Sequence, residues 1–169
     1  MSKFLYAVLF TCAVLSCHAQ PSKTASRGEA EYYVAAYARH YRVPLGFVRA
    51  IVDQESGWNP CAISRKGAAG LMQLMPLTAA RLGVGDRCNL RENVSGGVRY
   101  LAWLRHRFQG DLRLVAAAYL AGEEAIARRG LLYRNREVVA YVSRIRSKCQ
   151  QQLSREPPEG TQWRSITIR

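Results

Sequence analysis

Apolar residues return every three or four positions along most of this chain, which is the spacing of one face of a helix. Acidic residues come early and basic residues late in the first such segment, the order that a helix dipole favours. That segment covers residues 29–42, and its apolar side carries Tyr33, Val34, Tyr37 and Tyr41. Further segments with helical spacing cover residues 44–56, 76–82, 92–108, 111–120 and 135–148.

Residue types at the ends of these segments also indicate helices. Pro44 suits a first helical turn, because it has no N–H to donate and its φ is already helical. Asp111 stands where a side-chain oxygen caps a following helix. No alternating strand pattern competes with these segments. The sequence therefore predicts an all-α (mainly helical) single domain over residues 29–149, followed by a flexible basic tail over 150–169.

The N-terminal residues 1–19 have the parts of a secretory signal peptide. Lys3 precedes an almost wholly apolar stretch over residues 4–15, and the small residue Ala19 stands before a polar segment. We expect cleavage after Ala19, a polar linker over residues 20–28, and a periplasmic or secreted protein.

Two alternatives stay open for this N-terminal segment. Residues 14–17 resemble a bacterial lipobox, which would make the protein a lipoprotein anchored through Cys17. The apolar stretch could also be a buried first helix of the fold. It is shorter than the ~18–20 residues of a membrane-spanning helix, and no other apolar run reaches that length.

Three cysteines lie beyond this segment, and an exported chain meets an oxidising compartment in which disulfides persist. Cys61 and Cys88 both stand in polar, turn-rich sequence, so a disulfide between them is a hypothesis that leaves Cys149 free. None of the three has the close Cys/His spacing of a zinc site. We expect neither a metal nor a cofactor.

Composition and charge narrow the classes of partner. The 169 residues suffice for one domain with one core. Lysine and arginine number 25 against 12 acidic residues, which gives a net charge of +13. Such a charge predicts attraction to nucleic acid, to an anionic membrane surface or to an acidic cell-wall polymer, without choosing among them.

The second predicted helix places a carboxylate on its apolar side. Glu55 lies four residues beyond Ile51, so it continues the apolar stripe, whereas Asp53 falls off the stripe and is expected to be solvated. Burial of a carboxylate raises its pKa and favours the neutral form that a general acid needs. The alternative is that Glu55 only caps the helix or forms a salt bridge near its end. The stripe itself consists of Phe47, Val48, Ile51 and Val52.

Four blocks of sequence, taken in order, resemble the catalytic domain of the soluble lytic transglycosylases (SLT-type), which has a lysozyme-like fold and cleaves peptidoglycan. The resemblance covers roughly residues 36–146. It implies a lysozyme-like domain whose catalytic acid is Glu55. The blocks are ESGWNP at 55–60, GAAGLMQLMP at 67–76, ENVSGGVRYL at 92–101 and AAYLAG at 117–122.

The resemblance also implies where the substrate binds. It places Ser56, next to the catalytic acid, at the substrate. Gln73 and Met75 then line the glycan groove, with Gln73 supplying hydrogen bonds, and Tyr119 faces the reacting sugar. Met72 is expected in the core.

The late part of the family pattern maps Glu137 and Tyr141 onto the cleft. Two residues depart from the pattern. Leu120 replaces the usual asparagine, and Val138 lacks the hydroxyl of the usual threonine. These departures put some sugar contacts in doubt.

Ordinary glycosidases need two carboxylates at the bond, but only distant acids such as Glu137 could join Glu55. The resemblance implies a scheme with one carboxylate. Protonated Glu55 would give its proton to the oxygen between N-acetylmuramic acid and N-acetylglucosamine. It would then take the proton of the C6 hydroxyl, so that a 1,6-anhydro end forms.

Three other functions compete with this prediction. A hydrolytic muramidase on the same fold would release reducing ends, and the departures at Leu120 and Val138 suit a wall-binding module without catalysis. A nucleic-acid-binding protein fits the charge, but expected export and the spread of basic residues argue against it. We expect a monomer that binds peptidoglycan glycan strands and serves either wall turnover or an envelope-spanning secretion or conjugation apparatus.

Some residues of the third block have a structural prediction. Gly96 and Gly97 lie inside a helix, where glycine costs ~1 kcal/mol relative to alanine. A close crossing of another helix is the expected compensation. Tyr100, Trp103 and Leu104 are candidates for the core or for stacking against a ligand, and the core is the expected place.

Overall fold

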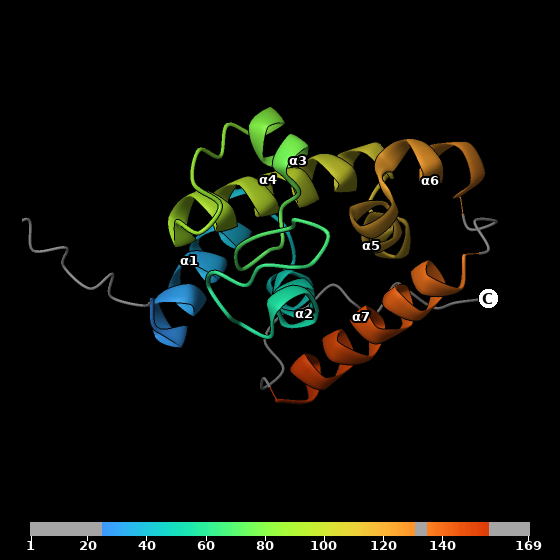
Figure 1. The fold of residues 1–169 in the computed structure, drawn as a ribbon. Coiled ribbons are helices and arrows are strands. Elements are labelled where there is room, and N and C mark those ends of the chain that lie inside the picture. The colour runs from blue at the N-terminus through green and yellow to red at the C-terminus, as the bar shows by residue number, and fades with distance from the viewer. Residues whose placement is uncertain (1–24, 131–134, 156–169) are drawn as a thin grey trace, which may run out of the picture.

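Helices α1, α4 and α2 lie together around the N-terminal half of the structure, and α5, α6 and α7 lie around the C-terminal half (Figure 1). The computed structural model describes residues 25–130 and 135–155. α2 packs against α1 and α7, and α5 packs against α4, α6 and α7. The helices are α1 (Arg27–His40), α2 (Leu45–Ser56), α3 (Pro76–Arg81), α4 (Leu90–Arg107), α5 (Leu112–Ala121), α6 (Glu123–Arg129) and α7 (Arg136–Arg155).

Several parts of the predicted organisation fall outside the described residues. These are the signal peptide at 1–19 with its lipobox alternative, most of the linker, and the tail beyond residue 155. They stay predictions. None of the helices in the described ranges is long and apolar enough to span a membrane.

Side-chain caps explain where the helices begin. The side chains of Ser26, Asn89 and Asp111 each accept a backbone N–H of the helix that follows, at 2.9–3.1 Å. The cap at Asp111 confirms the predicted start of α5. Because Ser26 caps α1, that helix starts at Arg27, and the last residues of the predicted linker belong to the domain.

The structure corrects the prediction in the C-terminal third. α6 was not predicted, although its acidic first turn and basic last turn between Gly122 and Gly130 are typical helix signals. α7 continues to Arg155, beyond the predicted end at Lys148, so residues 150–155 are helical and are not part of a flexible tail. The polar run of glutamines over 150–152 gave no apolar periodicity from which to predict this extension.

The core fills the space between α1, α2, α4, α5 and α7. The predicted stripe of α2 is buried, with Phe47 1% and Ile51 0% exposed. Leu101 and Leu104 of α4 are fully buried against it, as is Met72 from the loop between α2 and α3. This core anchors the last turn of α2, which carries Glu55.

The segment between α2 and α3 is held by one buried side chain. Asn93 of α4 is 0% exposed and accepts the N–H of Met72 at 2.8 Å. Its amide donates to the carbonyls of Ala69 at 3.1 Å and Arg87 at 2.9 Å. A Cβ on Gly70 would lie 2.1 Å from this amide, so only glycine fits beside Asn93.

The glycine pair of α4 makes room for a loop and not for a helix, which corrects the prediction of a close helix crossing. A Cβ on Gly97 would lie 2.4 Å from the sulfur of Met72. A Cβ on Gly96 would lie 2.4 Å from a methyl group of Val84. The segments before and after α3, which carry Met72 and Val84, therefore pack directly against the α4 backbone.

Cys61 and Cys88 form a disulfide, with their Cα atoms 4.7 Å apart, that joins the loop after α2 to the segment before α4. Cys149 is free and buried on α7, where its thiol donates to the Gly46 carbonyl at 3.8 Å. Burial raises the pKa of Cys149 to about 12, so this thiol stays protonated and unreactive at neutral pH.

We expect replacement of both Cys61 and Cys88 by serine to lower the free energy of unfolding by about 2–4 kcal/mol. The reason is that the bridge closes a loop with a sequence separation of 27 residues and so restricts the unfolded chain. Urea unfolding with and without reductant measures this. Reductant should lower the free energy of unfolding of the parent protein and leave that of the double variant unchanged. An equal free energy of unfolding of the parent with and without reductant would contradict the expectation.

Candidate active site around Glu55

Glu55 lies in the last turn of α2 and is half-buried. Burial raises the pKa of its carboxyl above the ordinary value. The hydroxyl of Tyr141 donates a hydrogen bond to Glu55 Oε1, which lowers that pKa and so opposes part of the effect of burial. Within residues 25–130 and 135–155 Glu55 forms no ion pair.

Tyr141 reaches Glu55 because α7 lies against α2 (Figure 1). An ion pair between Lys148 of α7 and Asp53 of α2 connects the same two helices. Asp53 is therefore not simply solvated, as the spacing predicts, but accepts a hydrogen bond from the Lys148 ammonium. The position of the Tyr141 hydroxyl thus depends on how α7 as a whole sits on α2.

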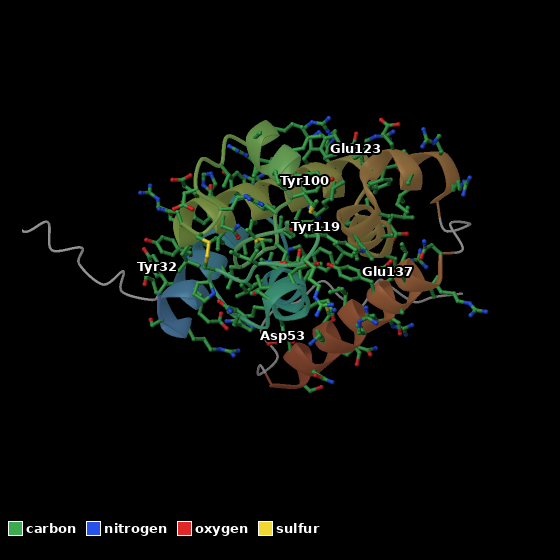
Figure 2. All side chains as sticks on the ribbon, in the orientation of Figure 1. Tyr32, Asp53, Tyr100, Tyr119, Glu123 and Glu137 are labelled. Carbon is green, nitrogen blue, oxygen red and sulfur yellow. A yellow bond between two sulfur atoms is a disulfide. The ribbon has the colours of Figure 1, made fainter. Side chains whose placement is uncertain are left out.

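Tyr119 of α5 lies within electrostatic reach of Glu55. Its hydroxyl donates to the Met72 carbonyl at 2.7 Å, which fixes the ring at the centre of the molecule (Figure 2). Burial, followed by the charge of Glu55, raises the pKa of Tyr119 well above its usual value. Tyr119 is thus a neutral hydroxyl, and its proton is directed to the backbone.

Gln73 and Ser56 are engaged with the protein's own backbone. The Gln73 amide donates to the carbonyls of Ala62 at 2.7 Å and Gly70 at 3.0 Å, so only its Oε1 is left to meet a ligand. The Ser56 hydroxyl donates to the Val52 carbonyl at 3.2 Å. The Ser56 hydroxyl oxygen also accepts the backbone N–H of Trp58 at 3.1 Å. Both side chains therefore shape the loop after α2. This structural role was not predicted from the sequence.

The remaining predicted site residues differ in exposure. Met75, at the start of α3, is 43% exposed, and Glu137, in the first turn of α7, is exposed. Val138 is 6% exposed, so the apolar side chain fills a core position where a hydroxyl would need a partner. Leu120 is 37% exposed beside Tyr119, where the family pattern has a polar residue.

Residues 32–141 match the protein family described as Transglycosylase SLT domain, over more than half of the chain. The chain belongs to this family. The resemblance inferred from the four sequence blocks is thereby confirmed, and so is the all-α, lysozyme-like fold class.

Curated relatives of this SLT domain are much longer proteins. It is 49% identical over 61 residues to the membrane-bound lytic murein transglycosylase F of Desulfosudis oleivorans, a match over 36% of this chain and 13% of the relative. It is 44% identical over 80 residues to the protein of that name in Thiobacillus denitrificans, over 44% of this chain and 17% of the relative. The chain thus spans less than a fifth of these relatives.

Solved structures agree with the family assignment. An inactive mutant of the lytic transglycosylase Slt from Pseudomonas aeruginosa has a TM-score of 0.63 and 25% identity, over 75% of this chain and 25% of that one. The 70 kDa soluble lytic transglycosylase of Escherichia coli gives the same TM-score and identity, over 70% of this chain and 23% of that one.

The SLT domain has a pocket of about 900 Å³ between α3, α4 and α6, in which Tyr100 and Trp103 lie. Trp103 is 45% exposed, so of its two predicted places the preferred one, the core, is wrong, whereas Leu104 is buried as predicted. The ring of Tyr100 lies 5.7 Å from that of Tyr119, centroid to centroid, so the pocket adjoins the candidate active site.

Charges from α3 and α6 lie at the pocket of the Tyr100 and Trp103 rings, whose centroids are 6.0 Å apart with an interplanar angle of 11°. Arg81 and Glu123 also line the pocket, and Glu123 lies near Tyr100 in Figure 2. Burial and the charge of Glu123 raise the pKa of Tyr100, and Arg81 lowers it. The sequence signal for this pocket was weak, since aromatic residues at helical spacing occur equally in cores.

No cluster of metal ligands accompanies the site in the described part of the chain, where no three His, Cys, Asp or Glu residues gather. The groups that the SLT domain's candidate site offers for chemistry are a partly desolvated carboxyl and a phenol that is its hydrogen-bond partner. A carboxyl of raised pKa can give up a proton near neutral pH and take one back.

We expect Tyr141→Phe to move the alkaline limb of the pH–rate profile to higher pH. The Tyr141 hydroxyl lowers the pKa of Glu55, so its removal raises that pKa further, and the carboxyl keeps its proton at higher pH. The rate at the optimum should fall about tenfold, because the carboxylate loses a hydrogen bond. Rates on isolated peptidoglycan between pH 4 and 9 measure this; an alkaline limb that moves to lower pH would contradict it.

Proposed function

We propose that this SLT domain is a lytic murein transglycosylase, which cleaves the β-1,4 bond between N-acetylmuramic acid and N-acetylglucosamine in peptidoglycan. The observation that carries the proposal is the half-buried Glu55, whose pKa is raised by burial and which accepts the Tyr141 hydroxyl. Membership of the family, and the names of relatives that cover parts of this chain, support it.

In the first step, protonated Glu55 donates its proton to the glycosidic oxygen, and the bond from that oxygen to C1 of the muramic acid breaks. The acetamido oxygen of the same sugar bonds to C1 and takes the place of a second carboxylate. The Tyr141 hydroxyl then stabilises the Glu55 carboxylate that has formed. The raised pKa favours the protonated start of this step, and the hydrogen bond favours its end.

In the second step, the Glu55 carboxylate takes the proton of the muramic acid C6 hydroxyl. That oxygen attacks C1, the bond from the acetamido oxygen to C1 breaks, and a 1,6-anhydro ring closes. Glu55 ends protonated, so no water is consumed. A scheme with one carboxylate is supported by the causes of the Glu55 pKa shift, which are burial and Tyr141 and not an acid elsewhere in the described residues.

We propose that the glycan lies along the exposed side chains near Glu55. Met75 and the Oε1 atom of Gln73 would contact it from one side and Glu137 from α7. The Tyr100–Trp103 pair in the adjoining pocket is placed to stack against a further sugar ring. The backbone bonds of Ser56 and Tyr119 favour roles in which they shape the site beside the substrate.

The test is mass spectrometry of the soluble products after the purified protein meets isolated peptidoglycan. We expect muropeptides with 1,6-anhydro ends, which are lighter by one water than the products of hydrolysis. Reducing ends would assign the domain to the muramidases and refute the second step. The absence of any product would refute catalysis and favour a wall-binding module, for which Leu120 and Val138 are the first residues to restore to the family pattern.

The proposed substrate places the protein outside the cytoplasm, in agreement with the predicted signal peptide. We propose that it works as a monomer on the wall, either in turnover or as the local wall-opening enzyme of an envelope-spanning secretion or conjugation apparatus. Fractionation of cells that carry the full chain tests the location. Retention in the periplasm or on the wall is expected, and recovery in the cytoplasm would refute it.

A further inference from the structure

A second concave surface lies on α1, away from Glu55. It is a pocket of about 500 Å³ that includes one side chain of α4, Arg91, and we call it the tyrosine surface. In Figure 2, Tyr32 marks it at the α1 end of the molecule, far from Tyr119 and Glu137. Its side chains other than alanine are Tyr32, Tyr33, Tyr37, Arg39, His40 and Arg91.

The tyrosines of this surface are arranged by the helical repeat. Tyr33 and Tyr37 are one turn apart, with ring centroids at 6.3 Å and an interplanar angle of 18°. Tyr41 continues the row at 6.2 Å and 19°. Tyr32 stands edge-on to Tyr33 and is 69% exposed. The row thus offers rigid aromatic area with hydroxyl groups at its rim, at a low entropic cost of ordering.

Cationic side chains complete the surface. Arg91 Nε donates to the Tyr37 hydroxyl at 3.4 Å, which holds its guanidinium beside that hydroxyl. Arg39 and His40 are exposed at the C-terminal end of α1, and Arg39 forms no ion pair within the described residues. No acidic residue lines the pocket. The surface is therefore suited to a ligand that combines flat apolar faces with carboxylates.

We infer that the tyrosine surface is an accessory binding site for a second stretch of peptidoglycan, in which sugar rings stack on the tyrosines and stem-peptide carboxylates pair with Arg39 and Arg91. The inference rests on the proposed function for its choice of polymer. Guanidinium groups bind carboxylates with geometry that ammonium groups cannot match. Tyr and Arg are also enriched at protein interfaces, so a protein partner is the outcome that the test below must exclude.

A second site on the same polymer would act through effective concentration. A wall fragment that is long enough to reach both sites binds more tightly than the active site alone, since the second contact is intramolecular. A fragment that reaches only one site gains nothing. The tyrosine surface should therefore increase retention on intact wall and leave turnover of a short soluble fragment unchanged.

The test compares two triple variants of the full chain, each with Glu55→Gln added so that the wall is not degraded. The first carries Tyr32→Ser, Arg39→Gln and Arg91→Gln, all at exposed side chains of the tyrosine surface. The control carries Val139→Ser, Arg107→Gln and Arg146→Gln, which remove the same number of charges and one exposed apolar side chain elsewhere. Binding is measured by co-sedimentation with purified sacculi, and folding by circular dichroism and melting.

We expect the first variant to bind sacculi about tenfold more weakly than its parent, and the control to stay within about twofold. Equal losses in both would overturn the inference, since net charge alone would then explain retention. Unchanged binding of the first variant would also overturn it, whatever the control does. The tyrosine surface would then be assigned to a protein partner. If the first variant does not fold, Arg39→Gln alone, at the exposed end of α1, is expected to weaken binding about threefold.

The same substitutions with Glu55 restored separate this inference from the proposed function. Turnover of a tetrasaccharide-peptide of two GlcNAc–MurNAc units joined along the glycan, which holds one cleavable bond and is chosen short so that it meets only the active site, should stay within about twofold of the parent. A matching fall in turnover would overturn the inference, because the surface would then support the active site. Failure of the parent to release any product would refute the proposed function, while the co-sedimentation result in the Glu55→Gln background would still decide on the tyrosine surface.

Discussion

Glu55→Gln is expected to lower the release of muropeptides by at least about two to four orders of magnitude while the protein stays folded. Glutamine can still accept the Tyr141 hydroxyl, so the contact between α2 and α7 is retained. It cannot donate a catalytic proton to the glycosidic oxygen or take one from the C6 hydroxyl. Both proposed steps therefore fail at once, and the loss is measured by product mass spectrometry and by the fall in turbidity of a wall suspension.

The same substitution is expected to raise the melting temperature at neutral pH. Burial raises the pKa of Glu55 in the folded state above its unfolded value. Between those two values the folded protein holds a proton that the unfolded chain has lost, so stability falls as pH rises through this window. Glutamine has no proton to lose. The stabilisation should thus be present above the folded pKa and disappear below the unfolded one.

Asp53→Asn is a suitable control for both measurements, since it neutralises a neighbouring carboxylate of α2. Asp53 pairs with Lys148 and has no part in the proposed chemistry, so most activity should remain and the melting temperature should not rise. Near-parental activity of Glu55→Gln would refute the assignment of the catalytic acid. Destabilisation by Glu55→Gln at neutral pH would show that the Glu55 carboxylate is not held in a desolvated site.

Glu55 could be located from sequence because the rule is local. A carboxylate three or four residues beyond buried apolar positions must continue the same side of the helix, and burial then raises its pKa. Its hydrogen-bond partner could not be located in that way. Tyr141 is 86 residues distant in sequence, and only the resemblance to the family placed it in the cleft.

The loop after α2 shows a second limit of prediction from sequence. The family pattern identified Gln73 as a site residue, but not that its amide would be used by Ala62 and Gly70. Such bonds depend on a backbone path with positive φ at both Gly70 and Gln73, which propensity does not reveal. The helices that were missed or shortened, α6 and the end of α7, have polar sequences in which periodicity is weak.

Asn93 was missed although the reasoning that found Glu55 applies to it. It lies three residues beyond Leu90 and four before Gly97, on the buried side of α4, where a polar side chain needs partners. Its neighbours in the chain carry no group that points to chemistry, so sequence alone does not mark it as a buried polar residue. The structure shows that its partners are backbone groups of the segment that carries Gln73 and Met75.

Asn93→Leu is expected to lower the free energy of unfolding by at least about 4 kcal/mol, because three buried backbone groups lose their partners. These are the N–H of Met72 and the carbonyls of Ala69 and Arg87. Leucine has as many side-chain heavy atoms as asparagine and bulkier methyl groups, so it leaves no cavity, and the loss arises from unsatisfied polar groups and from crowding. Urea unfolding measures it.

Activity should fall as well, and for a reason that separates Asn93 from a general core residue. Met72 accepts the Tyr119 hydroxyl through its carbonyl, so displacement of Met72 moves the tyrosine beside Glu55. The matched control is Asn89→Ala, which removes an exposed cap of α4 and should cost about 1 kcal/mol with activity retained. If Asn93→Leu proved no more destabilising than Asn89→Ala, water must satisfy the three backbone groups, and Asn93 would not be what holds the loop on α4.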